Sequence, residues 1–217
     1  MTESNEWYLL YKSTNLIKRR LHRHKIKYQR LQLPESIKNA TIIDLCCGTG
    51  EFGSIAAEKN PESLVIGVDS HLSSELRAQK TNFIFIQSSA YNIAIRGDSC
   101  DFLFCFHSLH HLGDVSSWQN LVKEMGRILK RGGKLYVIDH YPTLWLKIAV
   151  WLFKTPIVRL IPWMKDFQKQ LSTEKEILNY WLEHWKEFLQ LLAENGFTCR
   201  KFSKRLFFFY ANYDKSN

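Results

Sequence analysis

A carboxylate precedes a glycine-rich turn near residue 44 of this 217-residue chain. Asp44 stands in the apolar run 41–45, and the chain continues as Cys-Cys-Gly48-Thr-Gly50 into a helical stretch. Glycine has no Cβ, so such a turn lets the backbone approach a ligand closely, and the helix that follows directs free N–H groups to the same place. A carboxylate attracts an ammonium group and repels a pyrophosphate, so the segment predicts a site for a cationic ligand.

Residues 48–53 also fit the pattern Gly-x-Gly-x-x-Gly, which is typical of dinucleotide-binding turns. Two features argue against NAD: the carboxylate of Asp44, and the two residues Cys46 and Cys47 that lengthen the turn before its first glycine. A dinucleotide turn usually reaches glycine directly from the strand. Asp69 ends a second apolar run, where its carboxylate can accept both hydroxyls of a ribose or can cap a helix instead.

Five short apolar runs are predicted to be the strands that position these residues. They do not alternate with polar residues, as expected for strands covered on both faces, and they span 41–45, 64–68, 83–86, 102–106 and 135–138. Apolar residues from Trp118 to Leu129 recur at helical spacing, and Gly132 and Gly133 are expected to stop that helix. The alternation predicts a parallel sheet, and a tight connection near residue 205 predicts an antiparallel pair from 197–202 and 206–210.

Two segments lie outside this alternation. Residues 7–33 are predicted to be helical, and their basic run from Lys18 to Arg30 is interpreted as a solvated helix face. Residues 144–165 are strongly apolar and rich in Trp, and Thr173 begins a capping box that is expected to open a new helix. We expect the aromatic segment to be a lid over an apolar acceptor pocket. The alternatives are contact with an anionic membrane surface, a buried helix pair or a dimer interface.

Composition excludes several classes of protein. The chain is 45% hydrophobic, which suffices for one full core, and its formal charge of +9 permits nucleic acid, an anionic membrane or an anionic substrate as partner. Five cysteines without a Cys-x-x-Cys spacing argue against a disulfide framework and a zinc ribbon. The polar start argues against a signal peptide, and no apolar run is long enough to predict a spanning helix. We therefore expect a cytoplasmic protein, membrane-peripheral if the aromatic segment binds lipid.

The ordered motifs resemble those of the class I S-adenosylmethionine (SAM)-dependent methyltransferases. Asp44 to Gly50 is similar to their first motif, Gly67-Val-Asp69 to their acidic second-strand motif, 101–112 to their fourth-strand motif and 129–133 to the turn before strand five. The resemblance covers residues 38–139 well and is nearest to the ubiquinone/menaquinone-type small-molecule branch. It implies an α/β fold with a Rossmann-like, seven-stranded, mostly parallel sheet in the order 3-2-1-4-5-7-6, helices on both faces and an antiparallel last strand.

The resemblance also implies a division of the chain and a set of cofactor contacts. Residues 1–38 would be an N-terminal helical cap and 39–217 the SAM-binding domain, with the lid insert at about 141–182. Asp44 and the loop around Gly48 and Gly50, which includes Cys46 and Thr49, would hold the methionine end of SAM. Asp69 would bind the ribose, and Ser89 and Ala90 would lie by the adenine. Phe106 and His107 would line the cofactor at the end of strand four, and Ser70 is a further expected cofactor contact. The chain departs from the family pattern where Cys46 replaces Gly, Ser89 replaces Asp and Arg131 replaces Pro.

Methyl transfer from a sulfonium depends mainly on positioning, and a general base is needed only if the acceptor must lose a proton. The candidates at the carboxyl edge of the sheet are His107, His140 and Tyr141. His110 and His111 are expected to pack or to cap the next helix. No metal site is expected, because a strand interior should turn Cys105 away from the histidines.

These observations favour a SAM-dependent methyltransferase of a small, hydrophobic acceptor, with O-, N- or C-methylation left open. The alternatives are methylation of RNA or protein through the basic run, a non-catalytic SAM-binding partner protein and an NAD oxidoreductase. The chain lacks the Asn/Asp-Pro-Pro-Tyr motif of amino methylators and the paired catalytic cysteines of RNA cytosine methylators. Nucleic acid is therefore the less favoured partner.

Overall fold

A computed structural model of the chain describes residues 16–34, 37–71, 81–155 and 162–216. Seven strands form one sheet in the order β3-β2-β1-β4-β5-β7-β6, which confirms the predicted order. The strands are β1 (Thr41–Leu45), β2 (Leu64–Asp69), β3 (Phe83–Gln87), β4 (Cys100–Phe106), β5 (Leu129–His140), β6 (Phe197–Lys204) and β7 (Phe208–Lys215). Neighbours from β3 through β5 are parallel, whereas β7 is antiparallel to both β5 and β6.

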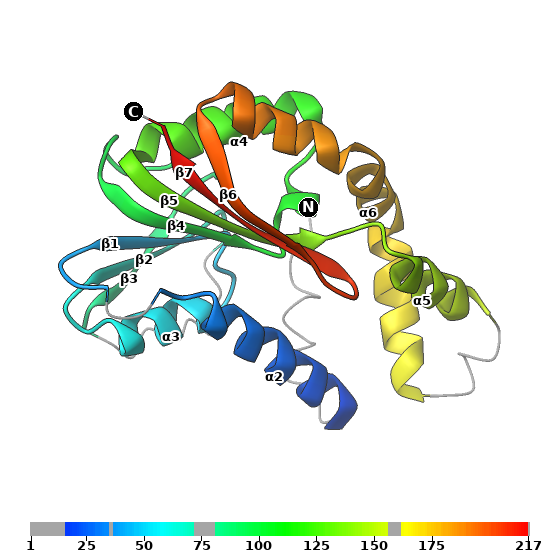
Figure 1. The fold of residues 1–217 in the computed structure, drawn as a ribbon. Helices are drawn as coiled ribbons and strands as arrows, with labels where there is room; N and C mark the ends of the chain where they lie inside the picture. Colours follow the sequence, from blue (N-terminus) through cyan, green and yellow to red (C-terminus); the bar gives the residue numbers. More distant parts are fainter. Residues whose placement is uncertain (1–15, 35–36, 72–80, 156–161, 217) are drawn as a thin grey trace.

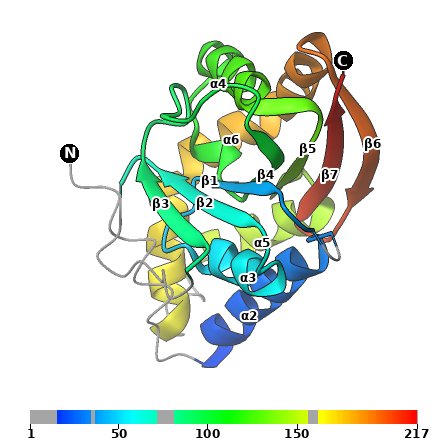
Figure 2. The same ribbon diagram turned by 90° about the vertical axis from the view of Figure 1, so that its left-hand side faces the viewer.

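Helices cover both faces of the sheet (Figures 1 and 2). One face carries α3 (Glu51–Lys59), with α2 (Leu16–Leu31) packed beside it, and the other carries α4 (Val115–Ile128) and the C-terminal part of α6 (Pro162–Glu194). Side chains along a strand alternate between the faces, so Ile42 and Phe104 enter the core beneath α3 while Ile43 and Cys105 enter the core beneath α4 and α6.

The sheet brings the carboxyl ends of four strands to one edge. Leu45 pairs with Cys105 and Phe106 pairs with Ile138, so β1, β4 and β5 end side by side, and β2 ends on the other side of β1. Because β7 runs antiparallel, His140 pairs with Phe208, and the β6–β7 hairpin tip reaches the same edge. Ligands of open α/β sheets bind at this edge.

Two predicted helix boundaries are wrong. The helix before β5 does not stop at Gly132 and Gly133: α4 ends at Ile128, because Leu129 already pairs with Cys100 as the first residue of β5. The capping box at Thr173 does not open a helix either, since α6 runs unbroken from Pro162 through it. No Gly or Pro interrupts 163–172, so the helical backbone continues into the capping-box sequence, although that sequence is also compatible with a helix start.

The predicted insert contains α5 (Leu144–Lys154) and the first turns of α6. Thr143 caps α5 by accepting the N–H of Leu146 at 3.0 Å. Of the predicted N-terminal helix, residues 7–15 lie outside the described part, and α2 begins at Leu16. Among the described residues, no helix combines the length and the apolar character that crossing a bilayer requires. The domain division at residue 38 stays a prediction.

Candidate functional site

The glycine-rich turn between β1 and α3 takes a left-handed backbone conformation at three residues. Cys46 has φ +59°, Gly48 has φ +54° and Gly50 has φ +71°. Gly50 directly precedes α3, and a Cβ there would lie 2.4 Å from the Phe85 ring, so this position requires glycine. Cys46 has the same left-handed conformation, which costs conformational energy in a residue with a Cβ and would not do so in Gly.

Asp44 is buried at the base of this turn, with only 4% of its surface exposed. Its Oδ2 accepts the backbone N–H of Gly53 at 3.1 Å, and no cation pairs with it within the described part of the chain. Burial raises the pKa of Asp44 to about 7, the Gly53 N–H opposes that rise, and the nearby Asp69 carboxylate adds to it. A buried carboxyl group held beside a second one favours a positively charged ligand.

Asp69 links the end of β2 to the turn. Its Oδ2 accepts the N–H of Gly48 at 2.8 Å, and its Oδ1 accepts the N–H of His71 at 3.1 Å. Cys46 and Cys47 follow Asp44 in the turn and are close enough to both carboxyl groups to be affected by their charge. Burial raises the pKa of both thiols, and the charges of Asp44 and Asp69 raise it further, so neither cysteine is a thiolate nucleophile.

The loop after β3 lies beside Asp69. Ser88 donates its N–H to the Asp69 carbonyl at 2.9 Å, Ser89 accepts the Tyr91 N–H at 3.2 Å, and Ala90 is buried. Ser89 and Ala90, the residues predicted to lie by the adenine, therefore follow a residue that is hydrogen-bonded to the backbone of Asp69. Ser70 is exposed and its hydroxyl contacts His71 Nδ1 at 2.9 Å.

Of two further residues predicted to contact the cofactor, Thr49 lies in the glycine-rich turn, whereas Phe106 lies at the end of β4. Thr49 is a half-buried residue of the turn itself. The ring of Phe106 is buried and packs on Phe52 with the centroids 4.8 Å apart. Its side chain therefore belongs to the core, and only its backbone stands at the edge of the sheet.

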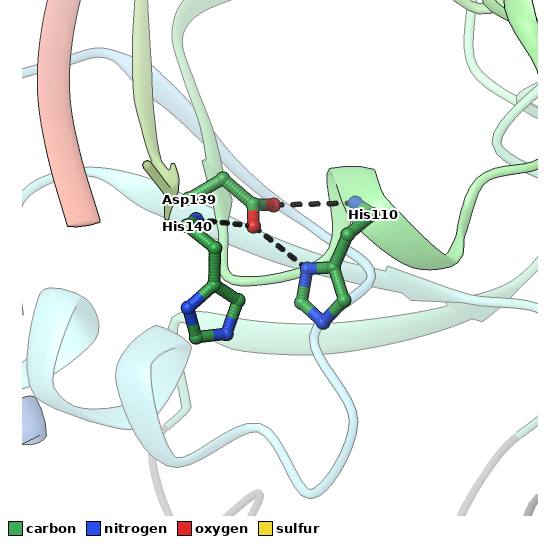
Figure 3. Close-up of side chains that lie close together, drawn as sticks. All are labelled: His110, Asp139 and His140. Atoms are coloured by element: carbon green, nitrogen blue, oxygen red, sulfur yellow. Dashed lines mark hydrogen bonds and ion pairs between the residues drawn. The ribbon is translucent and has the colours of Figure 1, made fainter. Parts of the chain in front are cut away.

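A second buried carboxylate, Asp139, organises the ends of β4 and β5. Its Oδ2 accepts the N–H groups of Leu109 at 2.8 Å and His110 at 3.3 Å, and its Oδ1 accepts the His140 N–H at 2.6 Å. His110 Nδ1 lies 2.7 Å from Oδ1 (Figure 3). Burial opposes ionisation, but the charge of His110, its hydrogen bond and the charge of His140 together hold the pKa of Asp139 well below its usual range.

This carboxylate fixes the tautomer of His110. An ionised carboxylate only accepts, so His110 Nδ1 carries a proton and donates it, and whenever the ring is neutral its lone pair lies at Nε2. The rings of His110 and His140 lie on the same side of Asp139, with their centroids 4.9 Å apart (Figure 3). Burial and the charge of His110 lower the pKa of His140 to about 4, so that ring is neutral.

His107 completes the cluster from the end of β4. It has a left-handed backbone, with φ +56°, and donates its N–H to the Ile138 carbonyl at 2.6 Å. Burial, Lys25 and His140 lower the pKa of its ring well below the usual value. His107 Nε2 and His140 Nδ1 are buried and have no hydrogen-bond partner among the described residues. The structure therefore brings two of the three predicted catalytic residues together.

Tyr141 lies on the other side of the strand end. Its ring packs on Trp185 with the centroids 5.0 Å apart, and Lys204 Nζ lies 5.0 Å from the ring centroid. These contacts place it between α6 and the β6–β7 hairpin. Of the two roles expected for His110 and His111, the structure shows packing: His110 is buried and the two ring centroids lie 4.0 Å apart, whereas Asp114 caps α4 by accepting the Ser117 N–H at 2.9 Å.

The sequence patterns did not indicate the contacts of Asp139 or its pairing with His110. The available signal was that β5, like β2, carries an Asp at its carboxyl end. The possible ligand atoms of His110, Asp139 and His140 lie within 4.8 Å of one another. Asp139 already accepts four N–H groups, however, which occupy the lone pairs that a cation would need. We therefore interpret the group as a hydrogen-bonded pair beside a second histidine.

Known proteins share both the sequence pattern and the fold. Residues 43–137 match a family model described as a methyltransferase domain. The ribosomal RNA large subunit methyltransferase G of Colwellia psychrerythraea is 30% identical in an alignment 160 residues long that covers 62% of this chain and 41% of that protein. The demethylmenaquinone methyltransferase of Lactococcus lactis is 28% identical in an alignment 177 residues long that covers 76% of this chain and 68% of that protein. The chain thus spans less than half the length of the first of these relatives.

A solved structure extends the likeness to most of the chain. Geranyl diphosphate C-methyltransferase from Streptomyces coelicolor, in complex with Mg2+, geranyl diphosphate and S-adenosyl-L-homocysteine, matches with a TM-score of 0.62 at 14% identity. The match covers 91% of this chain and 80% of that one. At this identity the likeness establishes the shared fold.

Proposed function

Because residues 43–137 match a methyltransferase-domain model and the sheet has the fold of known methyltransferases, we propose that this chain is a class I SAM-dependent methyltransferase that transfers the methyl group of SAM to a small, hydrophobic acceptor. One observation carries the proposal. The Asp44–Gly48–Asp69 turn and the Asp139–His110 pair stand at the carboxyl ends of adjoining strands of one sheet. A cofactor and an acceptor held at these two places would meet along a single edge.

The residues at the first place fit SAM. Asp44 is buried, has a raised pKa and has no cationic partner among the described residues, so it suits the ammonium group of the methionine part. Asp69 keeps free lone pairs for the ribose hydroxyls. A Cβ added at Gly48 would meet no atom within 4 Å, so the turn leaves open space beside its backbone. When bound, SAM supplies an electrophilic methyl group.

The second place supplies a base. Nε2 of His110 has a free lone pair, and Asp139 holds the ring in the tautomer that provides it. An acceptor O–H or N–H group would give its proton to this nitrogen as it takes the methyl group, and Asp139 would stabilise the resulting imidazolium. His107 and His140, both held neutral by burial, would line the acceptor side without adding charge.

Two features favour a small acceptor with apolar parts. A pocket borders this edge and is lined by His111, Gly113, Asp114, Ser117, Glu176, Ile177 and Tyr180, from the start of α4 and from α6. Beyond it, α5 exposes Leu144, Trp145 and Trp151. The likeness to a demethylmenaquinone methyltransferase points in the same direction. The acceptor atom stays open between oxygen, nitrogen and carbon.

The deciding experiment is a thermal-shift panel with SAM, S-adenosylhomocysteine and NAD. We expect the first two to raise the melting temperature and NAD to leave it unchanged, because ligand binding to the folded state stabilises it. Asp69→Asn should abolish the shift, whereas Asp214→Asn, which removes a carboxylate paired with Arg200 on the outer strands, should retain it. A shift with NAD alone, or an undiminished SAM shift in folded Asp69→Asn, would refute the site.

RNA is the second candidate acceptor. The likeness to a ribosomal RNA methyltransferase favours it, and so does α2, which contains no acidic residue. Salt-sensitive RNA binding that is lost on neutralising Arg19, Arg20 and Arg23 would support this alternative. Tight SAM binding without turnover on small molecules or RNA would instead support a non-catalytic SAM-binding partner.

A further inference from the structure

α5 turns an apolar face outward. Leu144, Trp145 and Trp151 have 70%, 57% and 63% of their surface exposed, and Ile148 and Leu152 are exposed beside them. At about 100° per residue these five side chains fall within one sector of the helix. Leu146 lies on the opposite side and is buried. The apolar side of α5 therefore faces outward, whereas an ordinary surface helix turns its apolar side to the core.

The tip of the β6–β7 hairpin extends this face. Thr143, at the start of α5, donates its hydroxyl to the Leu206 carbonyl at 2.6 Å, and Leu206 is itself 52% exposed. Arg205, next in the tip, contacts Tyr28 of α2 through Nε at 3.3 Å. Figure 1 shows the red hairpin tip pointing between α2 and α5. Three segments therefore meet at the sheet edge where His140 lies.

The charge of these three segments is one-sided. Residues 16–31, 141–154 and 200–209 contain thirteen of the 30 Lys and Arg of the chain and none of its 21 Asp and Glu. Exposed Leu, Ile and Trp on segments that contain cations and no anions are the composition of a helix that lies in a lipid headgroup layer. This combination is complementary to an anionic bilayer.

We propose that α5, the β6–β7 hairpin tip and α2 dock the protein on an anionic phospholipid surface. Leu144, Trp145 and Trp151 enter the headgroup region, and Lys147, Lys204 and Arg205 contact lipid phosphates. A second copy of the chain fits this surface less well, because a two-fold contact would bring two acid-free basic faces together. RNA fits less well too, because it has no aliphatic surface that could cover the side chains of Leu144, Ile148 and Leu152.

Docking would place the active-site edge beside the lipid. Resting on the proposed function, this placement adds that the acceptor is a molecule dissolved in the bilayer. The docking itself depends on neither SAM nor turnover, so vesicle binding can fail while the SAM thermal shift persists, and the reverse also holds.

The test is co-sedimentation of the full chain with vesicles of phosphatidylcholine alone or mixed with phosphatidylglycerol. We expect binding to the mixed vesicles that weakens with added salt. Leu144→Glu should weaken it roughly tenfold or more, since burial of a leucine is lost and a repelled charge is added. Leu64→Glu is the matched control, because Leu64 is an exposed leucine at the amino edge of the sheet, and its binding should be unchanged.

A charge series completes the test. Neutralising Lys204 and Arg205 together to Gln should weaken binding about 30-fold, at about 1 kcal/mol per cation near the surface. Neutralising Arg131 and Lys134, exposed at the amino edge, should have little effect. The proposal is overturned if the mixed vesicles do not bind the protein at low salt, if Leu144→Glu and Leu64→Glu bind equally, or if light scattering shows that Leu144→Glu dissociates a dimer. Preferential binding of RNA, lost in the same Lys204/Arg205 variant and unaffected by Leu144→Glu, would also overturn it.

Discussion

The backbone N–H of Gly48 donates to Oδ2 of Asp69 over 2.8 Å, so the turn after β1 is tied to the carboxylate at the end of β2. The other oxygen of Asp69 accepts the N–H of His71. An ionised carboxylate offers about four acceptor positions, so both oxygens retain one for a ligand. The turn that approaches the cofactor and the group that would hold its ribose are therefore positioned together.

Gly48→Ala is expected to weaken SAM binding more than it weakens the fold. At φ +54° an alanine costs about 1 kcal/mol, yet its Cβ meets no protein atom within 4 Å. A methyl group in the space proposed for the cofactor should raise the Kd roughly tenfold, as titration calorimetry would report. Gly132→Ala is the control. Gly132 has φ +72° and no atom within 4 Å of an added Cβ, but it lies near the amino end of β5, at the opposite edge of the sheet from the candidate site. Equal Kd values for the two variants would contradict the placement.

The affinity for S-adenosylhomocysteine should depend on pH through Asp44. Its pKa of about 7 lies above the usual value, so the ionised form that pairs with the ammonium group develops only as pH rises through 7. The Kd should fall about tenfold per unit between pH 5 and 7 and then level off. Asp44→Asn should bind weakly with no such slope, and a flat profile for the unchanged protein would refute the role of Asp44.

The stability of the ligand-free protein should follow the opposite trend. A carboxyl group whose folded pKa is raised contributes stability below its unfolded pKa of about 3.8, and this contribution is lost as pH rises through about 7. Asp44→Asn should therefore reduce the loss of stability between pH 5 and 8. Urea unfolding of both proteins at these two pH values measures the difference, and identical changes would mean that Asp44 ionises freely in the folded chain.

His110→Gln should lower kcat by about 10²- to 10⁴-fold on an oxygen or nitrogen acceptor, because the proton then has no positioned base. SAM binding should be unchanged, since His110 belongs to the other half of the edge. His184→Gln is a matched control: His184 Nδ1 lies 2.7 Å from Glu187 Oε1, the same geometry on the surface of α6. Turnover should fall only for the first variant.

Asp139 acts through His110, so its test is the pH profile. Asp139→Asn cannot hold the same tautomer of His110, and we expect a lower kcat together with a change in the acidic limb of the pH–rate profile, which is the limb that a general base produces. A variant that is merely unstable would show a lower melting temperature with an unshifted profile. That outcome would reduce Asp139 to a structural role.

The residues proposed to hold the cofactor could be identified from sequence, and the histidine half of the candidate site only in part. Asp44, Gly48 and Gly50 lie close along the chain, so local spacing alone indicates their chemistry. His110 and Asp139 are 29 residues apart, and their contact depends on β4 lying next to β5 and on the turn after His107. Spacing carries no such information. The position of the Phe106 side chain also depends on the sheet, since strand alternation turns its ring into the core.

The length of α6 could likewise not be predicted from local sequence signals. Its expected start at Thr173 was inferred from a capping box, yet such a box stabilises a helix end only where the preceding residues leave the helix. Trp181, Trp185 and Phe188 fix the C-terminal half against the sheet, and the helix propagates backward from there. Tertiary packing therefore decides where the helix lies.

Two glycines should respond in opposite directions to replacement by alanine. At Gly50 a Cβ would lie 2.4 Å from the Phe85 ring in a left-handed backbone, so Gly50→Ala should cost about 2–3 kcal/mol. Gly126 lies inside α4, where a Cβ would meet only Phe197 at 3.8 Å, so Gly126→Ala should gain about 0.5–1 kcal/mol of helix propensity. In a chain of this size these values correspond to a melting temperature lower by roughly 4–10 °C and higher by about 1–4 °C. Scanning calorimetry of both variants decides the matter. A destabilised Gly126→Ala would mean that α4 has no room at its sheet-facing side, whereas an unchanged Gly50→Ala would mean that Phe85 moves aside and that the turn does not require glycine.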